Sequence, residues 1–297
     1  MSDNLRRYRA IRHALAQCYP TSSLGNFARH LNTLAALLSG IVGSKSTPLP
    51  HLATTVPDGT KPERRVKRFA RWCANAHILA EVYLLPSVEV LRRPRALETV
   101  GLVMAGRGVG RGCPALMRPV VSKGRALPLA WRVRQAPQGH VPAELPIAMV
   151  ALRREVIPAG AQGVGLGDGA CDGTARQATR HEAGWADACR TATRTTATWD
   201  GTPWRLDTLG ACRKPGRLSE GKNVHGTREA YGPIMGRCCG AKGSQEPLSV
   251  VSNMLRAEEA CRWDAKRCRI ATFVSDQKSR GFHLHTSPIS EPQRRSR

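Results

Sequence analysis

The sequence predicts an α/β protein in which a mixed sheet is covered by helices and preceded by a small all-helical region. Three observations predict this class. Apolar residues recur at three- and four-residue steps through the first 90 residues, as they do in amphipathic helices. From residue 99 the apolar residues form short strand-like runs separated by turns rich in Gly, Lys and Arg. A helical pattern returns after residue 252.

Residues 1–90 are predicted to form the helical region. Helices are expected at 4–18 and 24–42, followed by a joint rich in Pro and Ser at 44–58. Thr60 and Glu63 have capping-box spacing, so a further helix should begin here. The polar side of that helix carries five cations: Arg64, Arg65, Lys67, Arg68 and Arg71.

Residues 91–297 are predicted to form the mixed sheet and its helices. The order of three strands, a helix, a strand, a helix and a strand is typical of a sheet with helices packed on it. Residues 197–252 predict a β-rich insertion, and Ser252 or Asn253 should cap the terminal helix. Glycines in the strand-like runs, such as Gly163, indicate a thin core. Strands are expected at 99–106, 114–122, 126–136, 162–170 and 186–196, and helices at 143–157 and 174–183.

The charge of the chain favours a polyanionic partner. Its 297 residues include 46 Lys and Arg against 22 Asp and Glu, which gives a formal net charge of +24. This excess is spread along the whole chain. That distribution favours a globular protein that binds nucleic acid over a protein with one basic tail. A solvated basic surface without a specific ligand is the alternative interpretation.

The remaining composition predicts a cytoplasmic bacterial protein that associates with the nucleoid and has no membrane partner. The N-terminus lacks the apolar segment of a signal peptide, and no apolar run approaches the roughly 20 residues of a membrane span. The ten cysteines contain no Cys-x-x-Cys pair. In a reducing compartment most of them should be small core residues rather than zinc ligands.

Two short motifs have ordinary explanations. The run from Gly165 to Ala170 matches the loose dinucleotide-binding pattern, but Gly-rich turns match it by chance. His283 and His285 would point about 200° apart on a helix, so we expect two solvated histidines rather than a shared metal.

Asp168, at the end of the 162–170 strand, is the candidate acid. It suits either a metal ligand or a turn residue.

Several collinear stretches resemble bacterial insertion-sequence transposases of the DDE class, in the IS-four-like family. The resemblance implies an RNase H-like core whose three carboxylates hold two Mg²⁺ ions, a β-rich insertion before the last acid, and a helical DNA-binding region. The implied partners are double-stranded DNA at transposon ends, and either a second copy of the chain or an intact transposase. The stretches include NLRRYRAIRHAL, VPDGTKPERRVKRF, KGRALPLAWRVRQAP and SDQKSRGFHLH.

Carried over residue by residue, the resemblance implies that two of the three acids are lost. The first acid of the family lies in a motif resembling Val-Ile-Asp-Gly-Ser, and the run from Val103 to Arg107 places Ala105 at the acid. The second acid is retained as Asp168. The last acid belongs to a Tyr-x2-Arg-x3-Glu-x6-Lys signature, in which Ala271 replaces the glutamate. The chain fills the four signature positions with Asp264, Arg267, Ala271 and Lys278.

The resemblance also implies roles for the remaining cations and for the end of the chain. Arg267 and Lys278 would still be available to contact DNA, together with the cations of the helix near residue 64. Family members continue beyond position 297 with an apolar helix, so the chain resembles a truncated and degenerate copy.

These substitutions predict a protein that binds DNA without cleaving it. Two Mg²⁺ ions need several carboxylates to offset their charge, and Asp168 alone should hold them poorly. No Asp or Glu lies between Glu98 and Glu144, so no local residue replaces the acid at position 105. On an uninterrupted helix Asp276 would face away from position 271 and Asp264 would lie two turns away.

Three functions therefore stay open at this point. The first is a degenerate DDE transposase, assigned to DNA transposition by resemblance. The second is a non-enzymatic DNA-binding protein that forms inactive complexes with intact transposase. The third is an active nuclease with a rearranged metal site, which metal-dependent cleavage would separate from the other two.

Overall fold

The structure is a computed structural model of the 297-residue chain. It describes residues 2–19, 25–80, 82–84, 86, 99–108, 114–122, 125–134, 162–167, 184–192, 195–199, 201–206, 208, 218–226, 231–240, 247–277, 281–286 and 291.

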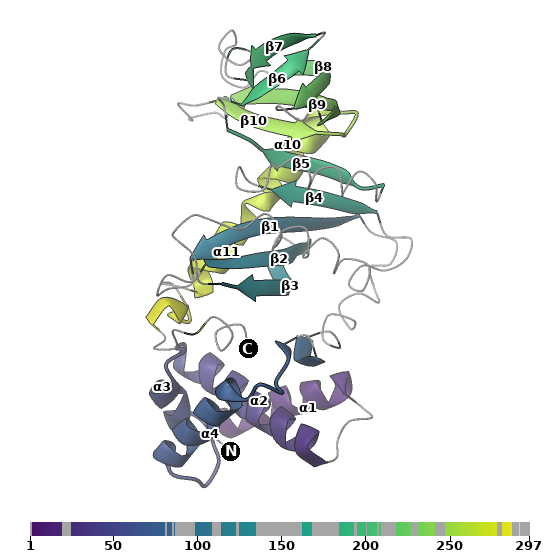
Figure 1. Cartoon of the computed structure of the whole chain (residues 1–297). Helices are drawn as coiled ribbons and strands as arrows, with labels where there is room; N and C mark the ends of the chain where they lie inside the picture. Colours follow the sequence, from purple (N-terminus) through teal and green to yellow (C-terminus); the bar gives the residue numbers. More distant parts are fainter. Residues whose placement is uncertain are drawn as a thin grey trace.

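Helices α1–α4 belong to the helical region, which lies beside the β3 end of the sheet (Figure 1). The predicted helices at 4–18 and 24–42 are confirmed as α1 and α2. Phe69, Leu52 and Ile78 are almost fully buried in the apolar cluster between the helices. Among the residues that the structure describes, no helix has both the length and the apolar composition to cross a membrane. The bounds are α1 Asp3–Cys18, α2 Gly25–Ser44, α3 Leu49–Thr54 and α4 Pro62–Ala74.

Two predictions about this region were wrong in detail. The stretch predicted as a joint contains α3, a six-residue helix that begins directly after Pro48. The predicted capping box is absent, because α4 begins after Lys61, which makes no side-chain cap hydrogen bond. The hydroxyl of Thr60 donates instead to a carboxylate oxygen of Asp58, at 2.6 Å. The capping-box spacing therefore located the start of the helix correctly, but Asp58 rather than a capping box organises this N-terminal end.

The described strands form one ten-stranded mixed sheet, in the order β3-β2-β1-β4-β5-β10-β9-β8-β6-β7 (Figure 1). β4 pairs in parallel with β1 on one side and β5 on the other, whereas the other described pairs are antiparallel. The bounds are β1 Val100–Gly108, β2 Pro114–Ser122, β3 Arg125–Val133, β4 Gly163–Gly167, β5 Ala186–Arg190, β6 Thr196–Trp199, β7 Thr202–Arg205, β8 Leu218–Gly226, β9 Tyr231–Gly240 and β10 Pro247–Ser252.

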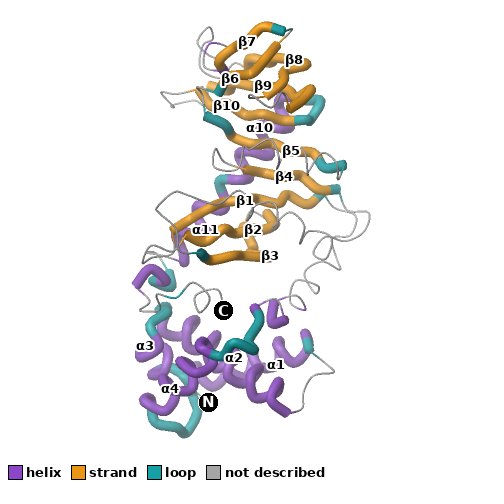
Figure 2. Tube along the Cα trace, viewed as in Figure 1, coloured by secondary structure: helices purple, strands orange, loops and turns teal. Residues whose placement is uncertain are grey.

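The predicted α/β class is confirmed, and the five predicted strands correspond to β1–β5, although the strand predicted at 186–196 ends at Arg190. The stretch predicted as a β-rich insertion supplies β6–β10 and extends the same sheet beyond β5, so it is not a separate layer. Figure 2 shows these strands continuing the sheet away from the helical region. The helices predicted at 143–157 and 174–183 lie outside the described residues.

The terminal helices cover one face of the sheet. α10 spans Ala257–Arg267 and contacts β4, β5 and β10, while α11 spans Arg269–Gln277 and contacts β1 and β3. The expectation of one long helix capped by Ser252 or Asn253 was wrong. The helix is interrupted at Cys268, between α10 and α11. Arg256 precedes α10 and makes no side-chain cap hydrogen bond. Asn253 is committed elsewhere, because its side chain accepts from the backbone N–H of Asp187 at 2.7 Å.

Gly163 has a packing role that its strand position alone did not predict. A Cβ atom at this position would overlap the indole ring of Trp185. Trp185 is buried with Val100 and Leu102 on the face of the sheet opposite α10 and α11. The missing side chain therefore makes room for a large aromatic ring, which itself fills the core.

Replacing Gly163 with alanine should destabilise the protein by about 1–3 kcal/mol, because the new methyl group overpacks a filled site. The matched control is Gly59→Ala, where a Cβ atom would have no neighbour within 4 Å. The control should change stability by less than about 1 kcal/mol. Urea unfolding followed by circular dichroism measures both variants. Equal effects of the two substitutions would show that Trp185 does not pack on this glycine in solution.

Candidate functional site

The carboxyl ends of the three parallel strands define the candidate site. The register places Met104 of β1 beside Gly167 of β4, and Gly167 beside Cys189 of β5. Ala105 therefore follows on β1, and Arg190 ends β5, at the same edge of the sheet. Position 168, the retained acid of the prediction, lies outside the described residues.

The side chain of Arg190 crosses from this edge to α10. Its Nη2 atom lies 2.7 Å from the Oδ2 atom of Asp264. The other carboxylate oxygen of Asp264 is 3.0 Å from Nε of Arg267, one turn along the same helix. Asp264 is only 1% exposed, so the two guanidinium groups replace the water that a charged carboxylate would otherwise need. We call Arg190, Asp264 and Arg267 the arginine–aspartate triad.

The triad changes the interpretation of the signature helix. Arg267 was predicted to contact DNA, but its side chain is 7% exposed and is held against Asp264. Ala271 is exposed on α11, beyond the interruption at Cys268. Lys278 lies outside the described residues. The DNA-contacting roles of Arg267 and Lys278 stay predictions.

The described residues do not fit a two-metal site. They contain no group of three His, Cys, Asp or Glu side chains placed to hold a metal ion. Ala105 and Ala271 have no ligand atoms, and both oxygens of Asp264 already accept from arginines. A divalent cation needs several carboxylate oxygens, so this part of the edge offers no such site.

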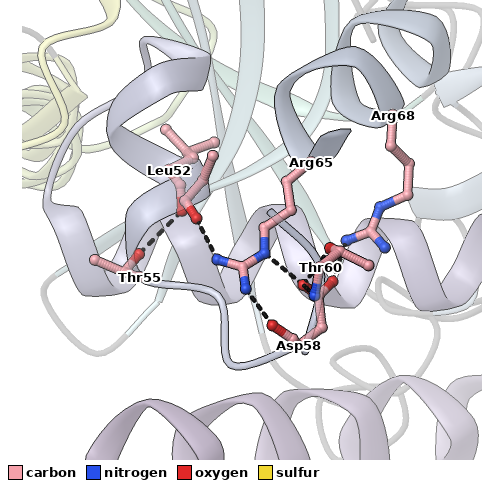
Figure 3. Close-up of polar contacts among 7 residues, drawn as sticks. Leu52, Thr55, Asp58, Thr60, Arg65 and Arg68 are labelled. Atoms are coloured by element: carbon pink, nitrogen blue, oxygen red, sulfur yellow. Dashed lines mark hydrogen bonds and ion pairs between the residues drawn. The ribbon is translucent and has the colours of Figure 1, made fainter. Parts of the chain in front are cut away.

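A second polar cluster lies where the chain enters α4, around Asp58 (Figure 3). Nε of Arg65 bonds to one carboxylate oxygen of Asp58, and Nη2 of Arg68 lies 2.7 Å from the other. Arg65 also donates to the carbonyl oxygen of Asp58 and, at 2.7 Å, to that of Ala53. Arg65 is buried as a result, so this arginine anchors the turn between α3 and α4.

The five predicted cations of α4 therefore fall into two groups. Arg65 and Arg68 bind Asp58. Arg64, Lys67 and Arg71 are exposed. Only the exposed group presents its charge to solvent without an ion pair to Asp58.

The cluster also sets the ionisation of Asp58. Burial by itself would raise the pKa of this carboxyl group. Hydrogen bonds from Thr60, Arg68 and Arg65, together with the charge of Arg68, outweigh burial and lower the pKa to about 2.

Sequence reasoning missed the triad and the Asp58 cluster. The spacing of Asp264 and Arg267 is a helical ion-pair spacing, which was available as a signal. Arg190 gave no such signal, because it lies 74 residues from Asp264 in the sequence. Asp58 precedes Arg65 by seven residues and was taken only as part of the joint.

Comparisons with known proteins provide structural similarities but no family. No protein-family model matches the chain, and no curated protein sequence matches it. A piggyBac transposase in a synaptic complex with hairpin DNA is 8% identical, with a TM-score of 0.46, over 100% of this chain and 64% of that chain. This chain thus spans less than two thirds of the piggyBac chain.

Two endonuclease structures are also similar. Human endonuclease V is 14% identical, with a TM-score of 0.34, over 60% of this chain and 83% of that chain. The catalytic domain of human endonuclease V is 14% identical, with a TM-score of 0.30, over 66% and 76%. All three TM-scores are below 0.5, so these similarities establish neither a family nor a function.

Replacing Asp264 with asparagine should destabilise the protein by about 3–5 kcal/mol, because it leaves Arg267 buried without a counter-charge. The matched control is Asp3→Asn, which removes an exposed pair with Arg6 and should cost about 0.5 kcal/mol or less. Urea unfolding at neutral pH measures both. A loss of unfolding free energy in Asp264→Asn that is no larger than the loss in Asp3→Asn would contradict the triad.

The low pKa of Asp58 predicts a pH-dependent contribution to stability. The folded state favours the carboxylate, so the contribution is full above the ordinary value of 3.8 and is lost as pH falls toward about 2. Because Asp58 is partly solvated, we expect about 1 kcal/mol at pH 6 relative to Asp58→Asn. Urea midpoints of both proteins between pH 3 and 7 test this. A difference that stays constant over that range would show that Asp58 ionises normally.

Proposed function

We propose that this chain is a transposase-like DNA-binding protein with an RNase H-like core that no longer cleaves DNA. The observation that carries the proposal is the composition of the candidate site. β1 carries Ala105 where the resemblance implies an acid. At the same edge β5 ends in Arg190, whose charge is directed to Asp264.

The sheet supports the core that the resemblance implies. Three antiparallel strands, β1 to β3, are followed by β4 and β5, which add in parallel on the other side of β1. The strands of the insertion come between β5 and the terminal helices. This is the order that the resemblance implies, with the insertion placed before the helix of the last acid.

The charge distribution supports DNA as the partner. The chain has a net charge of +24, and α4 presents Arg64, Lys67 and Arg71 to solvent. Phosphate contacts require only positive charge within reach, so they survive the loss of catalytic acids. Cleavage does not survive this loss. The attacking and leaving oxygens need metal ions, and the described residues lack the carboxylates to bind them.

DNA binding by the whole chain should depend steeply on salt. Arg64→Gln/Lys67→Gln should weaken binding and reduce the slope of log K against log salt by about 2, one for each phosphate contact. Fluorescence anisotropy with a labelled 20-base-pair duplex measures this in KCl. The matched control, Arg12→Gln/Arg125→Gln, removes two exposed cations outside α4 and should leave most of the slope. Salt-independent or undetectable binding by the unaltered chain would overturn the proposed function.

Nicking of supercoiled plasmid in Mg²⁺ or Mn²⁺ tests the loss of cleavage. The unaltered chain should produce no nicks, whereas Ala105→Asp/Ala271→Glu restores two of the expected metal ligands and should produce them. The control restores only Ala271→Glu, which leaves the site one acid short. Nicking by the unaltered chain that co-purifies with the protein would show an active, rearranged nuclease. Binding without nicking by the restored chain would show that these two positions do not meet in one site.

A further inference from the structure

A polar groove lies between α2 and α4, outside the candidate site. Its volume is about 540 Å³, and the described residues that line it include no carboxylate. The lining residues are Asn26, Arg29, His30, Asn32 and Thr33 from α2, with Arg68, Arg71, Trp72 and Asn75 from α4 and its end. The groove therefore combines three arginines with polar side chains and one tryptophan.

Two buried donors of this groove have no partner within the part of the chain that the structure describes. They are the indole N–H of Trp72 and the Nε–H of Arg68. Trp72 is only 8% exposed, and neither nitrogen can act as an acceptor. A buried donor without an acceptor is unfavourable, so both positions favour a ligand that brings acceptor atoms.

Two amide side chains of the groove, those of Asn26 and Asn75, are also left as donors. The carbonyl oxygen of Asn26 accepts from Arg29 at 2.5 Å, and that of Asn75 accepts from the backbone N–H of His77 at 3.0 Å. Their NH₂ groups therefore remain for a ligand. The hydroxyl of Thr33 donates to the carbonyl of Arg29 at 3.0 Å.

His30 is held in place by a contact with Tyr83, which is not among the described lining residues. Its Nδ1 atom lies 3.1 Å from the hydroxyl of Tyr83, and the backbone carbonyl of Tyr83 accepts from the hydroxyl of Tyr19 at 2.5 Å. Phe27 stacks on Tyr83 with ring centroids 5.4 Å apart. The contact with Tyr83 thus uses the Nδ1 atom of His30, and the Nε2 atom takes no part in it.

We propose that the groove between α2 and α4 binds a phosphate group. Phosphate oxygens only accept, they are several and close together, and guanidinium groups match their geometry and charge. The described lining contains no carboxylate that would repel an anion. The phosphate comes either from a nucleic-acid backbone or from a free phosphorylated compound. The nucleic-acid source rests on the proposed function, whereas phosphate binding itself does not.

The indole N–H of Trp72 reports directly on this groove. In the full chain labelled with ¹⁵N-tryptophan, the six tryptophans give six indole signals, and Trp72→Phe assigns the signal of Trp72. Inorganic phosphate and a 12-base-pair duplex are titrated separately. The Trp72 signal should shift more than the other five with phosphate, and the shift should fall at least five-fold in Arg29→Gln/Arg71→Gln.

The matched control is Arg12→Gln/Arg125→Gln, which has the same change in net charge and should keep the Trp72 shift. A Trp72 shift with both probes supports a nucleic-acid phosphate as ligand, and a shift with phosphate alone supports a free phosphorylated compound. No Trp72 shift with either probe, or equal shifts in the groove variant and the unaltered chain, overturns the proposal. Duplex binding in the anisotropy assay, with no Trp72 shift from either probe, would overturn the groove while leaving the proposed function intact.

Discussion

The carboxylate of Asp264 is the interaction on which the arrangement of the sheet and terminal helices depends. It is buried between a guanidinium from β5 and one from its own helix, so α10 can lie only where Arg190 of β5 reaches Asp264. With α10 fixed, α11 continues across the sheet and buries Ile270 and Val274 against β1 and β3. An apolar contact tolerates sliding, whereas a buried charge with two partners does not, so the triad sets the register of the helices on the sheet.

Much of the fold could be predicted because local patterns determine it. Periodicity located α1, α2 and β1–β5, because their apolar residues recur in helix-like or strand-like patterns. α3 was not predicted, because its six residues after a proline contain too few apolar positions to show a helical period. Gly163 was misjudged for a different reason. Its packing role depends on Trp185, which directly precedes the neighbouring strand β5 and is brought close only by the tertiary structure.

The candidate site was less predictable because charges act through distant partners. Cations at Arg65 and Arg267 look alike in a sequence and suggest one basic surface for DNA. In the fold each meets a nearby carboxylate that removes it from solvent, whereas Arg190 reaches Asp264 from 74 residues away in the sequence. A single sequence does not show which cations are committed. The groove between α2 and α4 was invisible for the same reason, since its lining comes from two separated helices.

The position of β10 has a consequence for how the chain folds. β10 joins the sheet beside β5, with Val250 opposite Arg190, although β6–β9 come between them in the sequence. The chain must close this long loop before the centre of the sheet is complete, and loop closure costs entropy before any contact returns it. The triad closes a still longer loop, between residues 74 apart. The sheet should therefore assemble slowly, with its last stabilising charges supplied by the final quarter of the chain.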